Sequence, residues 1–192
     1  MINQNNLNVL KLASKQDFKP EIASVLFTPE FTVATDSFHL IEMSMPKIEE
    51  DNLPGDAMEK FDPFMVRAND LKNLKIPKDK KNPICENAWV KEKEEDIVSI
   101  KDFIGCTETI HKYKMTPGEF PDYKQIIPEE GTIKARGAFN VELLIEGLEI
   151  LKAMKLKFGR VEIKFYGDQK PMVITADNGE QKARYLIMPL TN

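Results

Sequence analysis

The sequence has few of the residues on which disulfide frameworks and metal sites depend. Its 192 residues include two cysteines, Cys85 and Cys106, and two histidines, His39 and His111. Two cysteines are too few for a disulfide scaffold, and neither belongs to a Cys-x-x-Cys pair or a Cys/His cluster that could hold zinc. We therefore expect no metal site and no cofactor, and we expect both thiols to be buried in a reducing compartment.

Long apolar runs are also missing. The apolar segment 143–154 is interrupted by Glu146, Glu149 and Lys152, so it falls short of the roughly 18 apolar residues of a membrane-spanning helix. Residues 1–8 are polar and lack the basic start and apolar stretch of a signal peptide. We expect a cytoplasmic protein that does not contact membranes.

The motifs of several enzyme classes are absent as well. The sequence contains no nucleophile elbow, no His-Glu-x-x-His motif and no glycine-rich phosphate loop. Asp36 and His39 lie three residues apart, but a lone histidine near a strand end is more often structural than catalytic. Met43, Met45 and Met188 are better explained as adaptable apolar surface than as a soft-metal site. The chain is predicted not to be an enzyme.

Charge is segregated along the chain. The formal net charge is −4, which argues against a simple nucleic-acid-binding protein. Residues 1–20, 64–81 and 139–164 nevertheless carry net charges of +2, +4 and +1, so the remaining residues carry −11. Each of these basic segments contains a helical pattern, so basic charge is expected to collect on helices.

One pattern, a helix followed by about three strands, occurs three times. Helices are expected at 7–14, 66–74 and 141–154, the last capped by Asn140 and with Val141, Leu144, Ile145, Leu148, Leu151 and Met154 on its apolar side. Strands are expected at 22–27, 31–36, 40–43, 89–90, 97–103, 107–115, 161–165, 172–176 and 184–188. Runs of strands with single helices on one face predict an α+β architecture of antiparallel sheets. The acidic segment 46–63 is predicted to be a loop, and the proline-rich segment 117–131 an interdomain connector.

Five short motifs, in order, resemble one known family. They are Val33-Ala34-Thr35-Asp36 followed by Leu40, Gly118-Glu119-Phe120-Pro121-Asp122-Tyr123 with Ile127-Pro128, Phe139-Asn140, Lys170-Pro171, and Tyr185-Leu186-Ile187-Met188-Pro189-Leu190. Together they look like the bacterial DNA polymerase III beta subunit, the sliding clamp, and they cover most of the chain. One motif departs from the family, because Ser37-Phe38-His39-Leu40 stands where Gly-His-Arg-Leu is usual. This departure predicts a less cationic surface beside Thr35.

The resemblance implies a DNA-clamp fold and a processivity factor that catalyses nothing. Such proteins form rings of repeated helix-plus-strand half-domains, with helices lining a hole for double-stranded DNA and sheets at the rim. Basic helices would hold DNA through sequence-independent electrostatics. The other implied partners are a DNA polymerase and a clamp loader, which bind through short peptide motifs.

The chain is about half as long as a family protomer, and it resembles the middle domain plus the second half of the last domain. Residues 1–127 are expected to form a complete clamp-like domain with halves 1–45 and 63–127, and residues 128–192 a half-domain that carries the C-terminal tail. In the family, client peptides dock in an apolar pocket between the middle and last domains, and the matching residues here are Ile22, Thr35, Leu40, Pro128, Pro171, Leu186, Ile187, Met188, Pro189 and Leu190. The residues expected to face DNA are Lys11, Lys15, Arg67, Lys72, Lys75, Lys152 and Lys155.

The number of halves also bears on assembly. A family ring uses six domains, or twelve halves, and this sequence supplies three, so a ring of family size would need a homotetramer. The third half needs a partner to cover its apolar face and open sheet edge, and the simplest partner is the same half of a second chain about a two-fold axis. In the alternative, the third half folds back on its own chain and the protein is a monomer. The alternative function is a clamp-derived interaction domain that keeps the peptide pocket without forming a ring.

Overall fold

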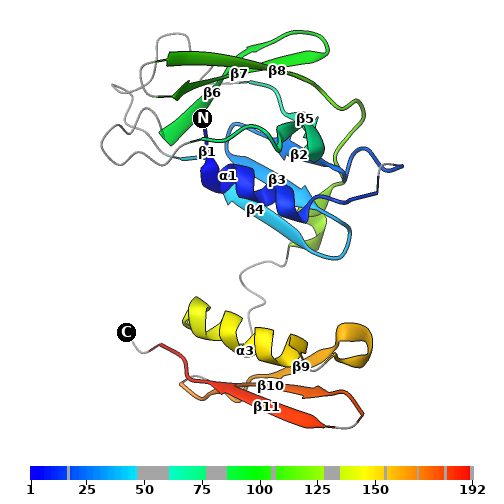
Figure 1. The fold of residues 1–192 in the computed structure, drawn as a ribbon, viewed down its shortest axis with the longest axis vertical. Coiled ribbons are helices and arrows are strands. Elements are labelled where there is room, and N and C mark those ends of the chain that lie inside the picture. Colours follow the sequence, from blue (N-terminus) through cyan, green and yellow to red (C-terminus); the bar gives the residue numbers. More distant parts are fainter. Residues whose placement is uncertain are drawn as a thin grey trace. The chain divides into compact units, whose positions relative to one another are not determined.

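The computed structural model describes residues 1–16, 18–46, 61–76, 86–104, 107–127, 135–153, 155–167, 169–179 and 181–190. The chain forms two compact units, Met1–Tyr123 (unit 1) and Lys124–Asn192 (unit 2) (Figure 1). Each unit is described by itself below. Cys85, Cys106, Pro128 and residues 47–60 of the predicted acidic loop lie outside the described residues.

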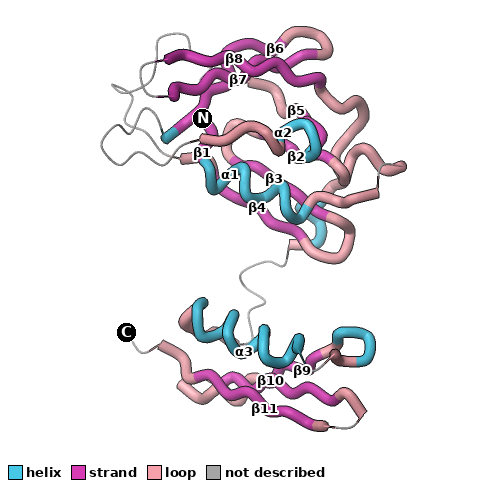
Figure 2. Tube along the Cα trace, viewed as in Figure 1, coloured by secondary structure: helices cyan, strands magenta, loops and turns pink. Residues whose placement is uncertain are grey.

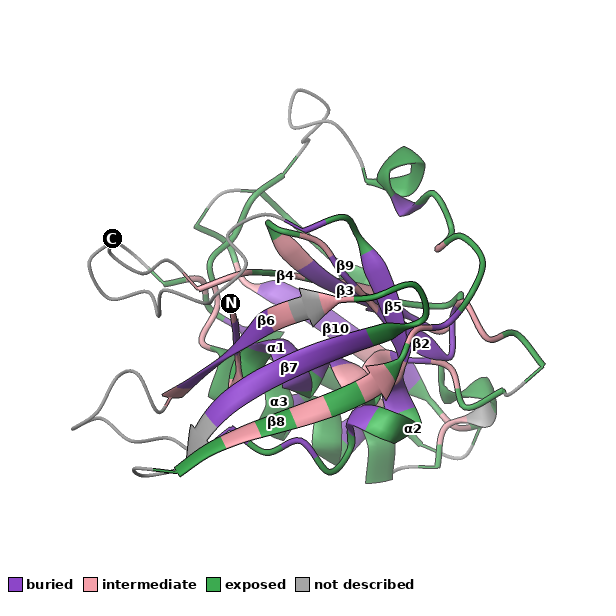
Figure 3. Ribbon diagram, turned by 90° about the horizontal axis from the view of Figure 1, so that it is seen from above, coloured by how far each residue is buried: buried purple, intermediate pink, exposed green. Residues whose placement is uncertain are grey.

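Unit 1 contains two four-stranded antiparallel sheets (Figure 2). Sheet A has the order β1-β6-β7-β8, formed by Ile2–Asn3, Asn87–Lys93, Ile97–Ile104 and Thr107–Lys114. Sheet B has the order β4-β3-β2-β5, formed by Leu40–Ser44, Phe31–Thr35, Ser24–Phe27 and Phe64–Arg67. The inner strand β7 is buried from Val98 to Asp102, whereas the edge strand β8 has no buried position (Figure 3).

Each sheet of unit 1 takes one strand from the other half of the unit. Strand β1 stands directly before the first helix, yet it pairs with β6, with Ile2 opposite Ala88. Strand β5 stands directly before the second helix and pairs with β2, with Val66 opposite Val25. Neither four-stranded sheet is therefore complete without a strand from the other half.

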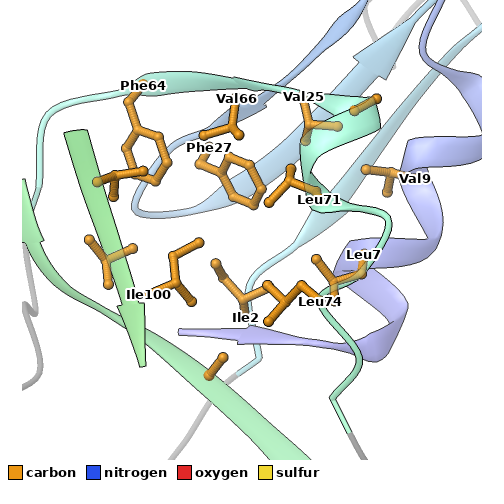
Figure 4. Packing of buried hydrophobic residues seen from close by; sticks show 14 of the residues in the cluster. Ile2, Leu7, Val9, Val25, Phe27, Phe64, Val66, Leu71, Leu74 and Ile100 are labelled. Atoms are coloured by element: carbon orange, nitrogen blue, oxygen red, sulfur yellow. The ribbon is translucent and has the colours of Figure 1, made fainter. Parts of the chain in front are cut away.

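The helices of unit 1 pack on a core that both halves share. They are α1 (Gln4–Asn8), the 3-10 helix η1 (Val9–Leu12) and α2 (Ala68–Leu71). Leu7, Val9 and Leu71 belong to one buried cluster with residues of β2, β5 and β7 (Figure 4). Burying such a side chain stabilises a fold by about 1.5–3 kcal/mol. This shared core makes the two halves one folding unit.

The first two helices differ from the sequence prediction. The first begins at Gln4 rather than near residue 7, because Asn3 caps it: the Asn3 side chain accepts from the backbone N–H groups of Asn5 and Asn6, and the Asn6 side chain accepts from the Asn3 N–H. The second was predicted from residue 66, but Val66 and Arg67 belong to β5. Val66 is fully buried opposite Val25, and this pairing overrides the local helical spacing.

Unit 2 has one helix on a three-stranded antiparallel sheet. Helix α3 spans Val141–Ala153, and the sheet has the order β11-β10-β9, formed by Lys182–Ile187, Met172–Asp177 and Val161–Lys164. Short 3-10 helices occupy Tyr123–Ile126 (η4) and Lys157–Gly159 (η6). The predicted cap is confirmed, because Asn140 Oδ1 accepts from the backbone N–H groups of Glu142 and Leu143 at 2.9 and 3.1 Å.

The predicted apolar side of α3 packs only in part. Leu144 and Leu151 contact the cluster formed with Met172, Ile174 and other strand residues, and Gly147 is buried with them. In contrast, Val141 is 65%, Ile145 50% and Leu148 37% exposed. These three residues lie on the predicted apolar side, but they are not buried within this chain. The residues spaced at 144, 147 and 151 face the sheet, and the next row of apolar residues lies on the flank of the helix.

The α+β class and the antiparallel sheets are confirmed. No helix among the described residues is both long enough and apolar enough to span a bilayer.

Candidate functional site

The helices of unit 1 and the residues that follow them carry exposed lysines and asparagines. They are Asn5, Asn8, Lys11 and Lys15 from the first half, and Asn69, Lys72, Asn73 and Lys75 from the second. Asp70 is the one acidic residue within 1–16 and 68–76. Lysine and asparagine side chains both donate hydrogen bonds to phosphate oxygens, so these side chains suit a polyanion. We call these eight residues the Lys/Asn face.

The packing of the helices determines which residues are exposed. Leu71 and Leu74 are buried, and Lys72 and Lys75 follow each of them by one residue on the outward side. The two halves are tied together here, because the backbone N–H of Ile76 donates to Gln4 Oε1 at 3.0 Å. Gln4 at the start of α1 therefore lies beside Ile76, five residues after α2 ends.

The structure separates the predicted DNA-facing residues into three groups. Lys11, Lys15, Lys72 and Lys75 are exposed on the Lys/Asn face, and Arg67 is half-buried at the end of β5. Lys152 is exposed in the last turn of α3 in unit 2 and Lys155 two residues after the helix ends, and the same helix carries exposed Glu142, Glu146 and Glu149. The sequence prediction did not include the four asparagines, which are exposed as well. Their spacing could have indicated them, because Asn5, Asn8 and Lys11 follow one another at three-residue intervals.

Three predicted peptide-site residues lie at one end of sheet B. Thr35 ends β3 and lies opposite Leu40, which begins β4. Ile22 is buried two residues before β2, the strand that pairs with β3 on its other side. Thr35 Oγ1 donates to the backbone oxygen of His39 at 2.8 Å and accepts from the N–H of Ser37 at 3.1 Å. This hydroxyl fixes the β3–β4 turn.

Asp36 organises the same turn. Its Oδ1 accepts from the backbone N–H groups of Phe38 and His39 at 2.9 and 3.1 Å and lies 2.7 Å from His39 Nδ1. These bonds, that of Phe38 first, hold the pKa of the Asp36 carboxyl below its usual value. Ser37 has a positive φ of 79°, and Phe38 is 94% exposed. The turn thus presents an aromatic side chain beside Thr35.

Six other predicted peptide-site residues gather at one end of the unit 2 sheet. Met172, which follows Pro171, lies opposite Ile187, so Pro171 and Met188 are neighbours at this end. Ile187 is buried, whereas Leu186, Met188 and Leu190 are 53%, 64% and 56% exposed and Pro189 is half-buried. The Leu190 N–H donates to the backbone oxygen of Ala138 at 2.7 Å, which ties the end of the chain to the segment before α3.

The predicted peptide-site residues thus form two groups, one in each unit. Pro128 lies outside the described residues. Two open hollows, of about 680 Å³ beside β5 in unit 1 and about 670 Å³ on the unit 2 sheet, are lined by other residues. The parts of the chain that the structure describes hold no group of three His, Cys, Asp or Glu side chains placed for a metal ion.

The fold is similar to that of bacterial replication proteins along the whole chain. The beta chain of DNA polymerase III from Streptococcus pneumoniae matches with a TM-score of 0.68 and 16% identity, over 99% of this chain and 48% of that one. The DNA polymerase III beta subunit of Thermotoga maritima matches with a TM-score of 0.59 and 16% identity, over 100% of this chain and 50% of that one. A ligand-bound DNA polymerase sliding clamp from Pseudomonas aeruginosa gives 0.63 and 16%, over 100% and 50%.

The fold is that of half a sliding clamp. The chain spans about half the length of these clamps. No protein-family model and no curated protein matches the sequence.

Proposed function

We propose that this chain is a non-catalytic DNA sliding clamp, a processivity factor that encircles duplex DNA and tethers a polymerase to it in the cytoplasm. The observation that carries the proposal is the match of the whole chain to sliding clamps. Four copies of the chain, each with three half-domains, would supply the twelve halves of such a ring. A clamp loader and a DNA polymerase would bind it through short peptide motifs.

The Lys/Asn face supports the DNA part of the proposal. It carries four exposed lysines and four exposed asparagines with one acidic residue, Asp70, among them. Contacts from such side chains to phosphates do not depend on base sequence, and each is weakened by salt. Such a surface would allow a ring to slide along DNA.

Charge reversal on α2 tests this part. The double variant Lys72→Glu/Lys75→Glu should weaken retention of duplex DNA and lower the slope of log K against log salt by about 2, since each phosphate contact contributes about one unit. Fluorescence anisotropy of labelled duplex DNA over about 50–200 mM salt measures both quantities.

A matched control reverses two exposed lysines elsewhere. Lys112 and Lys114 are exposed on β8, the edge strand of sheet A, and Lys112→Glu/Lys114→Glu changes the net charge by the same amount. The control should retain DNA as the unmodified chain does. Equal losses in both variants would mean that only net charge matters, and the Lys/Asn face would not be a DNA site.

The apolar residues at the two sheet ends support the peptide part. An anchor side chain such as Leu or Phe binds best in an apolar groove with a few backbone hydrogen bonds at its rim. Met188 and Leu190 are exposed, so Met188→Asp/Leu190→Asp should leave unit 2 folded. We expect this variant to bind a labelled client-type peptide ending in Leu-Phe about tenfold or more weakly. The control Phe158→Asp changes an apolar residue that is 91% exposed outside the predicted site, and binding as weak as in the double variant would contradict the pocket.

One observation favours the alternative function, a clamp-derived interaction domain that does not encircle DNA. Helix α3 carries three exposed glutamates, which would repel phosphate if they lined a hole. The two functions differ in one measurement. A closed clamp is retained on a circular duplex and lost when the circle is linearised, whereas an interaction domain is retained on neither.

A further inference from the structure

The strands of unit 1 pair in a regular way, and unit 2 lacks one of the corresponding pairings. In unit 1, the strand before each helix crosses to the other half and pairs with the first strand after that half's helix, as β1 does with β6 and β5 with β2. In unit 2, the first strand after the helix is β9, and β10 is its one neighbour among the described residues. By the same pattern, β9 lacks a fourth strand from another half.

Unit 2 also carries a candidate for such a strand, and its Ala138 oxygen accepts from the Leu190 N–H within the chain. Residues 135–139 stand directly before α3, in the position of β1 before α1 and β5 before α2, but they form neither helix nor strand. Residues 135–138 are exposed. The segment and the β9 edge are complementary, and they are not paired with each other among the described residues of unit 2.

An apolar surface accompanies the open edge. Tyr185 of β11 donates from its hydroxyl to the backbone oxygen of Leu143 at 2.7 Å, so the Leu143 flank of α3 faces β11. Ile145 and Leu148 therefore lie on the opposite flank, toward β9, where Ile163 and Phe165 are 50% and 56% exposed. Of the 18 large apolar side chains exposed in the described residues, 14 belong to unit 2. Unit 1 has covered its apolar residues, and unit 2 has not.

We infer that unit 2 forms a two-fold symmetric pair with unit 2 of a second copy of this chain. Residues 136–139 of each chain add to the β9 edge of the other, and the two α3 helices lie side by side through Val141, Ile145 and Leu148. The result is one shared domain with two four-stranded sheets, built as unit 1 is built within a single chain. The interface is isologous, so each surface meets its own copy.

Charge on α3 suits this arrangement. In unit 1, Gln4 at the start of α1 accepts from the backbone N–H of Ile76, five residues after α2 ends, and we take an antiparallel order for the two α3 helices of the shared domain. An antiparallel pair of α3 helices places Glu142, near the start of one, next to Lys152, near the end of the other. Opposite charges therefore meet at both ends of the apolar row.

Unit 1 is a poor alternative partner for the β9 edge. Both strands that accept an exchanged strand, β6 and β2, are already paired with β1 and β5. Its two sheets have four strands each, so it has no exchanged strand to give. A second copy of unit 2 supplies both the strand and the apolar flank.

The oligomeric state of the full chain tests the inference. Light scattering at about 10–50 μM should give at least twice the 22.0 kDa of one chain. Ile145→Glu should convert the protein into a monomer with an unchanged circular dichroism spectrum, because a charge buried at an interface without a partner is unfavourable. The matched control is Ile150→Glu, on the opposite flank of α3 and 68% exposed, which should keep the oligomer.

A charge swap provides a second readout. Lys152→Glu should weaken the dimer, and Glu142→Lys in the same chain should restore it, because opposite charges again meet across the axis. A monomeric wild type, a dimer that survives Ile145→Glu, or equal losses for Ile145→Glu and Ile150→Glu would each overturn the inference. The inference extends the self-association proposed above, but it rests on strand pairing and not on DNA binding. The measurement of oligomeric mass and the measurement of DNA retention can therefore contradict the two proposals separately.

Discussion

Asn6 joins the first helix to the sheet beneath it. Its Nδ2 donates to Thr32 Oγ1 at 3.0 Å and to the backbone oxygen of Ser44 at 3.1 Å. Its Oδ1 accepts from the backbone N–H of Asn3. The residue is 1% exposed, so water cannot replace these partners.

We predict that Asn6→Ala lowers the free energy of unfolding of unit 1 by about 1–3 kcal/mol, because buried acceptors lose their donor. Asn6→Asp should be worse at neutral pH, since a buried carboxylate offers no donor to Thr32 or Ser44. Urea denaturation followed by the fluorescence of Trp89 measures both. The matched control Asn8→Ala changes an exposed asparagine of α1 and should stay within about 0.5 kcal/mol. Equal effects at the two positions would contradict the role given to Asn6.

Asp36 gives the β3–β4 turn a pH dependence with a defined sign. Its pKa is lowered in the folded state, first by the backbone N–H of Phe38. Its contribution to the turn is therefore present above the ordinary aspartate pKa of about 3.9 and is lost as the pH falls through the lower folded-state pKa. We predict that the amide signals of Phe38 and His39 shift only at the acid end of an NMR titration from pH 5 to pH 2. In Asp36→Asn, which keeps the acceptor oxygen at every pH, these signals should not respond. A midpoint at or above 3.9 would contradict the predicted hydrogen bonding.

At the scale of elements, the sequence predicts what depends on local pattern and misses what depends on distant pairing. The strands of apolar and β-branched residues are all present, and α3 begins at its predicted cap. Strands β1 and β5 could not be predicted, because two or four residues carry little pattern and their partners lie far along the chain, as Ala88 does from Ile2. For the same reason the peptide-site residues could be named from a resemblance but not joined into one site. The exposed flank of α3 could not be predicted, because apolar residues occupy a wider part of the helix surface than the sheet covers.

Helix α3 requires glycine at position 147, although glycine has a low helix propensity. Glycine within a helix costs about 1 kcal/mol relative to alanine. A Cβ at position 147 would, however, overlap the ring of Tyr185, and that ring is held by the hydrogen bond from its hydroxyl to Leu143. The close approach of α3 to β11 therefore requires glycine.

We predict that Gly147→Ala destabilises unit 2 by about 1–3 kcal/mol, the usual cost of overpacking, instead of stabilising it. In a Tyr185→Ala background the same substitution should become neutral or stabilising, because the obstructing ring is gone. A double-mutant cycle from urea denaturation, followed by circular dichroism, gives the coupling. A stabilising Gly147→Ala in the unmodified chain would show that the Tyr185 ring yields easily and that α3 does not need the close approach.

At the scale of the whole molecule, the two units differ in how many strands their sheets contain and in how much apolar surface they leave exposed. Unit 1 supplies all four strands of each of its sheets. It has four exposed large apolar residues in its described part, against 14 in unit 2. Half-domains joined by exchanged strands can be completed within one chain or between two. This chain uses the first solution in unit 1, and the proposed dimer uses the second in unit 2. Assembly and folding are thereby linked for unit 2 alone.

This linkage predicts two thermal transitions that respond differently to protein concentration. A tenfold increase in concentration stabilises a dimer by about 1.4 kcal/mol, which for a unit of this size raises the midpoint by roughly 5–10 °C. The midpoint of unit 1, followed by the fluorescence of Trp89, the single tryptophan, should not move. The midpoint of unit 2, followed by calorimetry, should rise. In Ile145→Glu the unit 2 transition should fall to a lower temperature and lose its concentration dependence while the Trp89 transition stays in place. If both midpoints were independent of concentration in the unmodified chain, unit 2 would complete its fold without a second copy.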